Sequence, residues 1–137
     1  MVAIVEKLVE LGASSLFAGM SPEALYPVAA IAAVVSRAPG EVVVREGDPG
    51  DALFVVVSGT LAVSREGKHL KEVGAGATFG EIALLDGAPR SATITAVTAA
   101  ELLRIPREEL TALLDESPEL SRGIIRTLIG HLRAASG

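Results

Sequence analysis

The sequence lacks cysteine and tryptophan, and its only aromatic residues are three phenylalanines and one tyrosine. Without cysteine, disulfide bonds, cysteine-ligated zinc and thiol catalysis are excluded. A hydrophobic core must therefore be built from valine, leucine, isoleucine and alanine. No tryptophan or tyrosine lies near the C-terminus, so no such ring is available there to stack on a ligand.

Basic residues and long apolar runs are also scarce. Twelve lysines and arginines stand against 17 acidic residues, giving a net charge of −5, which argues against a nucleic-acid-binding surface. No run of 18 apolar residues occurs, so we expect no membrane span. The N-terminus has no basic leader, which favours the cytoplasm. His69 and His131 stand alone, so we expect no metal site and no metal cofactor.

Helix signals lie at both ends of a chain of 137 residues, long enough for one domain. Apolar residues at helical spacing predict a helix over 2–11. Ser21, followed by proline and glutamate, predicts the start of a second helix, which Pro27 should kink or break. Two further helices are predicted to begin at Pro106 and at Ser117.

The stretch 34–105 has a different composition, with frequent glycines between short runs rich in valine and threonine. This pattern predicts an antiparallel sandwich or barrel. The acidic segment 47–51 has too few ligands and the wrong spacing for calcium, and we interpret it as a turn. The predicted strand runs are 42–44, 53–57, 60–63, 70–73, 91–97 and 101–105.

The last predicted helix is apolar over half of its circumference. Such a surface should not remain in water, so it packs on the sheet structure, on a ligand site or on a second copy of the chain. Three arginines share the opposite face. The apolar residues are Leu120, Ile124, Ile125, Leu128, Ile129 and Leu132.

Residues 79–93 carry the most informative pattern. Gly80 has no Cβ atom and lets the backbone approach closely. The N–H groups of Ile82 and Ala83, at the start of a short apolar helix, would point at an anion, which the helix dipole also favours. Arg90 offers a planar fork that can grip two phosphate oxygens. We expect this arginine to lie at an exposed tip.

The order of residues in 79–93 resembles the phosphate-binding cassette of cyclic nucleotide-binding domains. The resemblance extends over about residues 16–132 and includes the turn phrases at 39–41, 45–51 and 57–59. It implies an α+β fold, mainly β: an eight-stranded antiparallel β-roll with N-terminal helices and two C-terminal helices. It also implies that Glu81 accepts a hydrogen bond from the ribose 2′-hydroxyl, which explains an acidic residue inside an anion site.

Several site residues have a second interpretation. Glu81 would otherwise be a helix cap, and Arg90 a turn residue paired with Asp86 or Glu81. Ser91 either contacts the phosphate or the base, or bonds its own backbone. Thr93 either lines the base pocket or is an ordinary strand residue, which we favour. The expected binding site consists of Gly80, Glu81, Ile82, Ala83, Arg90, Ser91, Ala92 and Thr93.

We expect three segments: a linker helix at 1–15, the nucleotide-binding domain at 16–133 and a frayed tail at 134–137. The resemblance implies a regulatory sensor that binds a cyclic nucleotide, and we expect cAMP rather than cGMP. We expect no enzymatic activity, because the sequence offers no catalytic apparatus such as a Gly-x-Ser-x-Gly nucleophile elbow. Ligand would order the cassette and reposition the last helix, with Ile124, Ile125 and Leu128 as an apolar lid.

The expected partners are the cyclic nucleotide, an output domain outside this chain, and a second copy through the last helix; nucleic acid and membrane are not expected. The alternative function is a ligand-independent interaction or dimerisation module on the same fold. An enzyme on a cupin-like barrel would need a histidine-rich metal site, which two isolated histidines do not provide.

Overall fold

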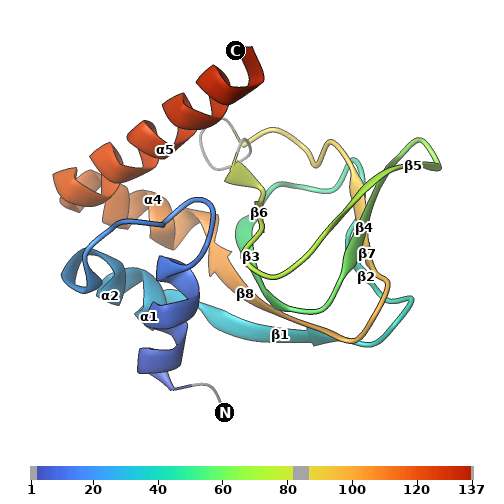
Figure 1. Cartoon of the computed structure of the whole chain (residues 1–137), viewed down its shortest axis with the longest axis horizontal. Coiled ribbons are helices and arrows are strands. Elements are labelled where there is room, and N and C mark those ends of the chain that lie inside the picture. The colour runs from blue at the N-terminus through green and yellow to red at the C-terminus, as the bar shows by residue number, and fades with distance from the viewer. Residues whose placement is uncertain (1–2, 82–86, 137) are drawn as a thin grey trace.

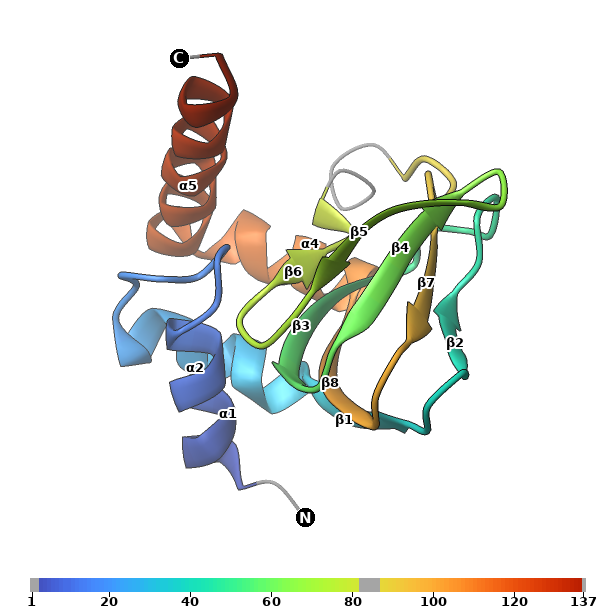
Figure 2. The same ribbon diagram turned by 45° about the vertical axis from the view of Figure 1, so that its right-hand side comes forward.

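The computed structural model describes residues 3–81 and 87–136, with side chains described up to residue 134. Figure 1 shows the helices gathered on one side and a curved β-structure on the other. The turned view in Figure 2 shows α5 running away from the β-structure, with the C-terminus at its far end.

The described strands form two four-stranded antiparallel sheets, with the orders β1-β8-β3-β6 and β2-β7-β4-β5. This arrangement confirms the predicted β-roll. The strands are β1 (Ala33–Arg37), β2 (Val42–Val44), β3 (Ala52–Ser58), β4 (Leu61–Arg65), β5 (Lys68–Val73), β6 (Thr78–Phe79), β7 (Thr93–Ala96) and β8 (Ala100–Pro106).

Strand β3 joins the two parts of the core, because successive side chains of a strand point to opposite faces. Leu53 and Val55 pack into a cluster with the helices. Phe54 and Val56 pack into a second cluster between the two sheets. All four side chains are buried, so β3 is the strand on which the helical layer and the roll interior meet.

The helices of the described residues are α1 (Ile4–Gly12), α2 (Pro22–Ile31), α4 (Arg107–Glu116) and α5 (Pro118–Ser136). Both serine caps are confirmed. The hydroxyl of Ser21 accepts from the N–H of Ala24, and the hydroxyl of Ser117 accepts from the N–H of Leu120. Each cap is followed by proline at the first helical position, where its fixed φ suits the helix and its missing N–H is not needed.

Of the two outcomes predicted at Pro27, the break is wrong, because α2 runs unbroken from Pro22 to Ile31, and the kink stays a prediction. Four residues of this helix are buried, and Val28 belongs to the helical cluster. The lost backbone hydrogen bond at Pro27 is therefore outweighed by tertiary packing, which supplies most of the stability of helices in proteins.

Both ends of the described chain are helical, and the expected division into linker, domain and tail stays a prediction. Leu11 of α1 is fully buried in the helical cluster, and Ile4 and Leu8 pack against it. Helix α5 extends as far as Ser136, and the frayed tail expected at 134–137 stays a prediction. Among the described residues, no helix has the length and hydropathy needed to cross a membrane.

Candidate functional site

A pocket of about 470 Å³ lies between the β2-β7-β4-β5 sheet and the segments before and after the undescribed residues 82–86. Its apolar lining includes Val44, Val63, Val73, Phe79 and Ile94. Its polar lining is provided by Arg65, Lys71, Thr78, Glu81, Arg90 and Ser91. Three cationic side chains and one carboxylate therefore face the pocket, although the chain as a whole carries a net charge of −5.

The backbone of Arg90 is fixed by the acidic turn. The N–H of Arg90 donates to the carbonyl of Asp48 over 2.8 Å, and the carbonyl of Arg90 accepts from the N–H of Gly47 over 2.9 Å. The turn itself is closed by a bond from the N–H of Asp48 to the carbonyl of Arg45. The segment 47–51 is thus a turn, as predicted, and it anchors the arginine.

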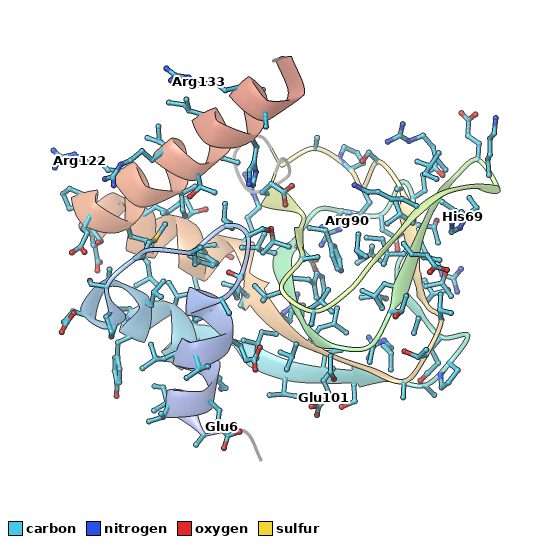
Figure 3. All side chains as sticks on the ribbon, viewed as in Figure 1. Glu6, His69, Arg90, Glu101, Arg122 and Arg133 are labelled. Carbon is cyan, nitrogen blue, oxygen red and sulfur yellow. The ribbon has the colours of Figure 1, made fainter. Side chains whose placement is uncertain are left out.

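The side chain of Arg90 is buried, with 7% of the residue exposed, so the expected exposed position is wrong. Its Nη2 donates to the carbonyl of Ala52 over 2.8 Å and lies 3.7 Å from Oδ1 of Asp51. The guanidinium lies 5.6 Å from the ring centroid of Phe54, which stacks on Phe79. Figure 3 shows Arg90 among the strands of the roll.

Burial lowers the pKa of Arg90, and the negative charge of Asp51 opposes that shift. Arg104 adds a smaller lowering effect, and Asp48 a smaller raising effect. Since an arginine side chain titrates far above neutral pH, the guanidinium stays charged. Asp51 also binds Arg104 over 3.3 Å, so this exposed carboxylate links the two arginines.

Gly80 brings its backbone against Arg90. Its φ is +96°, and a Cβ atom there would lie 2.7 Å from the carbonyl oxygen of Ala52 and 2.7 Å from Nη1 of Arg90. The sequence predicted close approach at this glycine. The structure shows that the approaching groups are the arginine and β3.

Two buried polar atoms at the pocket have no hydrogen-bond partner within the described residues: Oε2 of Glu81 and Nη1 of Arg90. Buried polar atoms are almost always paired, because leaving one unpaired costs about 1–3 kcal/mol. One atom is an acceptor and the other a donor, and both residues line the same pocket. The site therefore suits a ligand that carries both an anionic group and a hydroxyl group.

The family model described as "Cyclic nucleotide-binding domain" matches residues 34–117, which include all of these groups. The chain belongs to the cyclic nucleotide-binding domain family.

Two curated relatives show where such domains occur. A cyclic nucleotide-gated potassium channel of Mesorhizobium japonicum is 34% identical over 92% of this chain, which covers 35% of the channel. A CRP-like cAMP-activated global transcriptional regulator of Mycobacterium tuberculosis is 28% identical over 90% of the chain, which covers 57% of the regulator. The chain thus spans roughly a third to a little over half of these relatives.

A solved structure of similar size shares the fold. The N-terminal domain of a transcriptional regulator from Streptomyces coelicolor A3(2) aligns with a TM-score of 0.81 at 33% identity. The alignment covers 91% of this chain and 93% of that one. The similarity therefore extends over the helices as well as the roll.

The remaining predicted site residues of this cyclic nucleotide-binding domain divide into three groups. Ser91 and Ala92 line the pocket. Thr93 does not line it; its hydroxyl accepts from the N–H of Glu46, and the residue begins β7. Ile82 and Ala83 lie outside the described residues, as does Asp86, one of the two alternative partners of Arg90.

The three residues expected to form a lid do not line the pocket. Ile124 is buried in the helical cluster, and Leu128 packs against that cluster. Ile125 is 55% exposed. In this conformation α5 packs with its Ile124 side on the domain, and the lid stays a prediction for the ligand-bound state.

Sequence reasoning missed three charged residues of the site, Asp51, Arg65 and Lys71, and the pocket-lining Thr78. Asp51 stood in the segment 45–51 that resembles a family turn, and this was the one available signal for it. Arg65 and Lys71 gave no signal, because they look like exposed residues of a hairpin. Among the described residues, no group of three or more histidine, aspartate or glutamate side chains could hold a metal ion.

Proposed function

We propose that this domain is a sensor that binds a cyclic nucleoside monophosphate without transforming it. The observation that carries the proposal is a pair of buried atoms in one pocket that have no partner among the described residues, Oε2 of Glu81 and Nη1 of Arg90. A cyclic nucleotide has the matching groups, since its phosphodiester is an anion and its ribose keeps a free 2′-hydroxyl.

In this proposal Arg90 binds the phosphate through Nη1 while Nη2 remains on the carbonyl of Ala52. Because one nitrogen is fixed by β3 and held near Asp51, little side-chain entropy is lost on binding. Glu81 accepts a hydrogen bond from the 2′-hydroxyl. Charge-assisted bonds of both kinds are stronger than neutral ones, and burial strengthens them further.

The apolar lining receives the base. Val63, Val73 and Ile94 come from three neighbouring strands of one sheet, and Phe79 comes from the other sheet. Contact between the base and these side chains would remove apolar surface from water. This burial stabilises the complex by roughly 25 cal/mol per Å² of apolar surface. The cAMP preference expected from the sequence stays a prediction; the relative from M. tuberculosis is named as cAMP-activated, which is a statement about that protein.

We further propose that ligand binding is transmitted through a population shift. Ligand would favour the state in which the cassette is ordered around the phosphate and α5 is repositioned, and only a difference in affinity between the two states can drive such a shift. The relatives are a channel and a transcriptional regulator, so an output domain joined to this one fits the proposal. A cytoplasmic location fits as well and stays a prediction.

A second candidate function is self-association through α5, and one observation favours it. Ile125, Ile129 and Leu132 are 55%, 45% and 67% exposed. Figure 3 shows Arg122 and Arg133 on the side of α5 that points away from the roll. An apolar stripe of this kind marks an interaction surface, here one for a second copy. Concentration-dependent association without any nucleotide effect would favour this candidate.

Thermal unfolding tests the sensor proposal. At a ligand concentration of about 100 times Kd, binding stabilises the folded state by roughly 2.7 kcal/mol, which raises Tm by several degrees at this chain length. We expect this rise with a cyclic nucleotide and not with 5′-AMP, whose dianionic phosphate lacks the ring closure. Equal Tm values with all ligands at millimolar concentration would contradict the proposal.

A further inference from the structure

A second pocket, of about 270 Å³, is lined by β1 and β2. Each of these strands is the outer strand of its own sheet, and in the described sheets they do not pair with each other, so the roll is open along this seam. In Figure 2, β2 lies on the side of the roll away from the helices. Arg90 lines this seam pocket as well as the first pocket, so the two share one guanidinium.

Two more arginines enter the seam pocket from the inner face of the roll. Arg104 on β8 lies opposite Phe54, and Arg37 on β1 lies opposite Ala100. Opposite residues of paired strands share a face, and both Phe54 and Ala100 are buried in the cluster between the two sheets. Since Arg37 and Arg104 both line the seam pocket, three guanidinium groups surround it.

The carboxylates of the seam pocket do not balance these three positive charges. Asp51 is shared, since its Oδ1 lies 3.7 Å from Arg90 and its Oδ2 lies 3.3 Å from Arg104. Asp48 also lines the pocket, but within the residues that the structure describes neither Asp48 nor Arg37 forms an ion pair. Arg104 is close enough to Arg90 for its charge to lower the pKa of Arg90. An anion in the pocket would offset this excess of positive charge.

The hydrogen-bond donors of Arg37 and Arg104 are only partly used. Nε and Nη1 of Arg37 donate to the carbonyls of Val42 and Ser36 over 3.3 and 2.9 Å, and its Nη2 has no partner in the described part of the chain. Arg104 makes one bond there, from Nη2 to Asp51. A guanidinium has five N–H donors and can bind a carboxylate through two parallel bonds. Both arginines therefore keep donors for a ligand.

Protection of a sheet edge explains Arg37 but not Arg104. An inward-pointing charge on an outer strand discourages pairing with another molecule, and β1 is an outer strand. Strand β8 lies between β1 and β3, so Arg104 has no free edge to protect. A charge on an inner face is costly unless it is paired, and the one carboxylate that Arg104 contacts is shared and 68% exposed. A bound anion accounts for both arginines.

We propose that the seam pocket binds a small organic carboxylate. Its carboxylate group is held by Arg37 and Arg104, and its apolar body lies against a lining that includes Val35, Val43 and Phe54. The pocket is smaller than the roughly 300–1,000 Å³ of sites for larger organic ligands, so the body is about one ring or a short chain. Inorganic phosphate would satisfy the arginines but would leave the apolar lining in water.

Because Arg90 is shared, this carboxylate opposes an anion in the first pocket. A carboxylate in the seam pocket and a phosphate on Nη1 of Arg90 both depend on the same positive charge, and their own charges repel. Each ligand therefore lowers the affinity for the other, by the same factor. This antagonism rests on the proposed function, whereas binding in the seam pocket does not.

The test is an NMR titration of the isotope-labelled chain, without nucleotide, using benzoate, benzyl alcohol and inorganic phosphate. We expect benzoate to shift the amide signals of β1 and β2 and to bind with a Kd of about 1 mM. Benzyl alcohol keeps the ring but lacks the charge, so it should bind about tenfold more weakly or less. Phosphate should also bind more weakly than benzoate.

Arg37→Gln and Arg104→Gln should each weaken benzoate binding about fivefold or more, through lost charge-assisted hydrogen bonds. Arg37→Gln is the cleaner variant, because Arg37 is not paired with Asp51 and the link from Asp51 to Arg90 is kept. Arg45→Gln is the matched control: it removes the same charge from an exposed residue that lines neither pocket. Its affinity for benzoate should stay unchanged, and thermal unfolding checks that each variant is folded.

The antagonism is measured by calorimetry. Saturating benzoate should weaken the binding of cyclic AMP or cyclic GMP about fivefold, and the saturating nucleotide should weaken benzoate binding by the same factor. Unchanged nucleotide affinity in the presence of bound benzoate overturns the antagonism.

The outcomes separate this inference from the proposed function. No binding of benzoate, equal binding of benzyl alcohol, or equal losses in all three variants overturns the seam site. Tighter binding of phosphate than of benzoate overturns the choice of an organic carboxylate. If benzoate binds while neither cyclic nucleotide does, the proposed function and the antagonism are overturned and the seam site stands.

Discussion

Gly80 and Arg90 are in such close contact that a Cβ atom at position 80 would lie 2.7 Å from Nη1 of the arginine. Side-chain carbons do not approach so closely, and the φ of +96° is itself unfavourable for any other residue. The glycine that opens the cassette therefore determines where the guanidinium sits. The site depends on this backbone position as much as on the charged side chains.

Gly80→Ala should destabilise the domain by about 1–3 kcal/mol through backbone strain and should also displace Arg90. Nucleotide affinity should fall about tenfold or more, because Nη1 can no longer occupy its position. Gly67→Ala is the matched control, since Gly67 also has a positive φ but no atom within 4 Å of an added Cβ. Chemical denaturation should show a larger loss of the free energy of unfolding for Gly80→Ala, whose Cβ atom also meets Ala52 and Arg90, and titration should show a loss of affinity for this variant alone. Similar affinities would contradict the role of Gly80.

Arg90→Ala should weaken nucleotide binding by about 2–5 kcal/mol, as is typical when one partner of a buried charge pair is removed. Because Arg90 is buried and bonded to Ala52, the substitution should also lower the free energy of unfolding by about 1–3 kcal/mol. Arg90→Lys keeps the charge but loses the fork. Titration should give Arg90→Lys a nucleotide affinity between that of the unmodified chain and that of Arg90→Ala. Unchanged affinity in either variant would refute the assignment of the phosphate site.

Asp51→Asn should weaken binding several-fold through Arg90, which loses its anionic neighbour at 3.7 Å. The stability loss should stay within about 1 kcal/mol, because the Asp51 side chain is 68% exposed and surface ion pairs contribute little. Asp48→Asn is the control: its backbone carbonyl holds the N–H of Arg90 and is kept by the substitution. Equal affinities of the two variants would show that Asp51 does not position the arginine.

Ile124 and Ile125 are neighbours on α5 with opposite environments, 2% and 55% exposed. Ile124→Ala should lower the free energy of unfolding by about 2–5 kcal/mol, the usual range for a buried isoleucine. Ile125→Ala should change it by less than about 0.5 kcal/mol. If Ile125 covers the ligand or a second copy, its substitution should instead reduce affinity or self-association, measured by titration and by sedimentation. Equal stability losses would show that α5 packs differently in solution.

Local signals in the sequence were sufficient for an antiparallel sandwich or barrel and for most elements, whereas the β-roll came from the resemblance of residues 79–93 and the turn segments to the family. The caps at Ser21 and Ser117, the short runs rich in valine and threonine, and the glycine-rich turns each depend on short-range chemistry. Two short elements were missed: β1 at 33–37, which directly follows α2, and the two-residue β6. Both are defined by pairing with distant strands, β1 with β8 and β6 with β3, so no local pattern identifies them.

The candidate site was predicted where the motif is contiguous and missed where it is assembled by folding. Glu81, Arg90 and Ser91 lie close together in sequence, and all three line the pocket. Asp51 reaches Arg90 from 39 positions earlier, through a turn that pairs with the backbone of the arginine. Lys71 reaches the pocket through its register with Val63.

The burial of Arg90 was mispredicted for a related reason. An arginine next to a Gly-Ala-Pro turn resembles a surface residue in the sequence. It is buried because the 47–51 turn and β3 close over it, and the carbonyl of Ala52 and the carboxylate of Asp51 compensate for the loss of water.

The most direct test of the account uses the ribose hydroxyl. A cyclic nucleotide and its 2′-deoxy analogue should be titrated against the unmodified chain and against Glu81→Ala, which forms a double-mutant cycle. The account predicts that removing the 2′-hydroxyl weakens binding by about 1.5–3 kcal/mol in the unmodified chain and by much less in Glu81→Ala, because the same hydrogen bond is already lost. Equal losses in both proteins, or no binding of the cyclic nucleotide to the unmodified chain, would contradict the central claim that Glu81 and Arg90 hold a cyclic nucleotide between them.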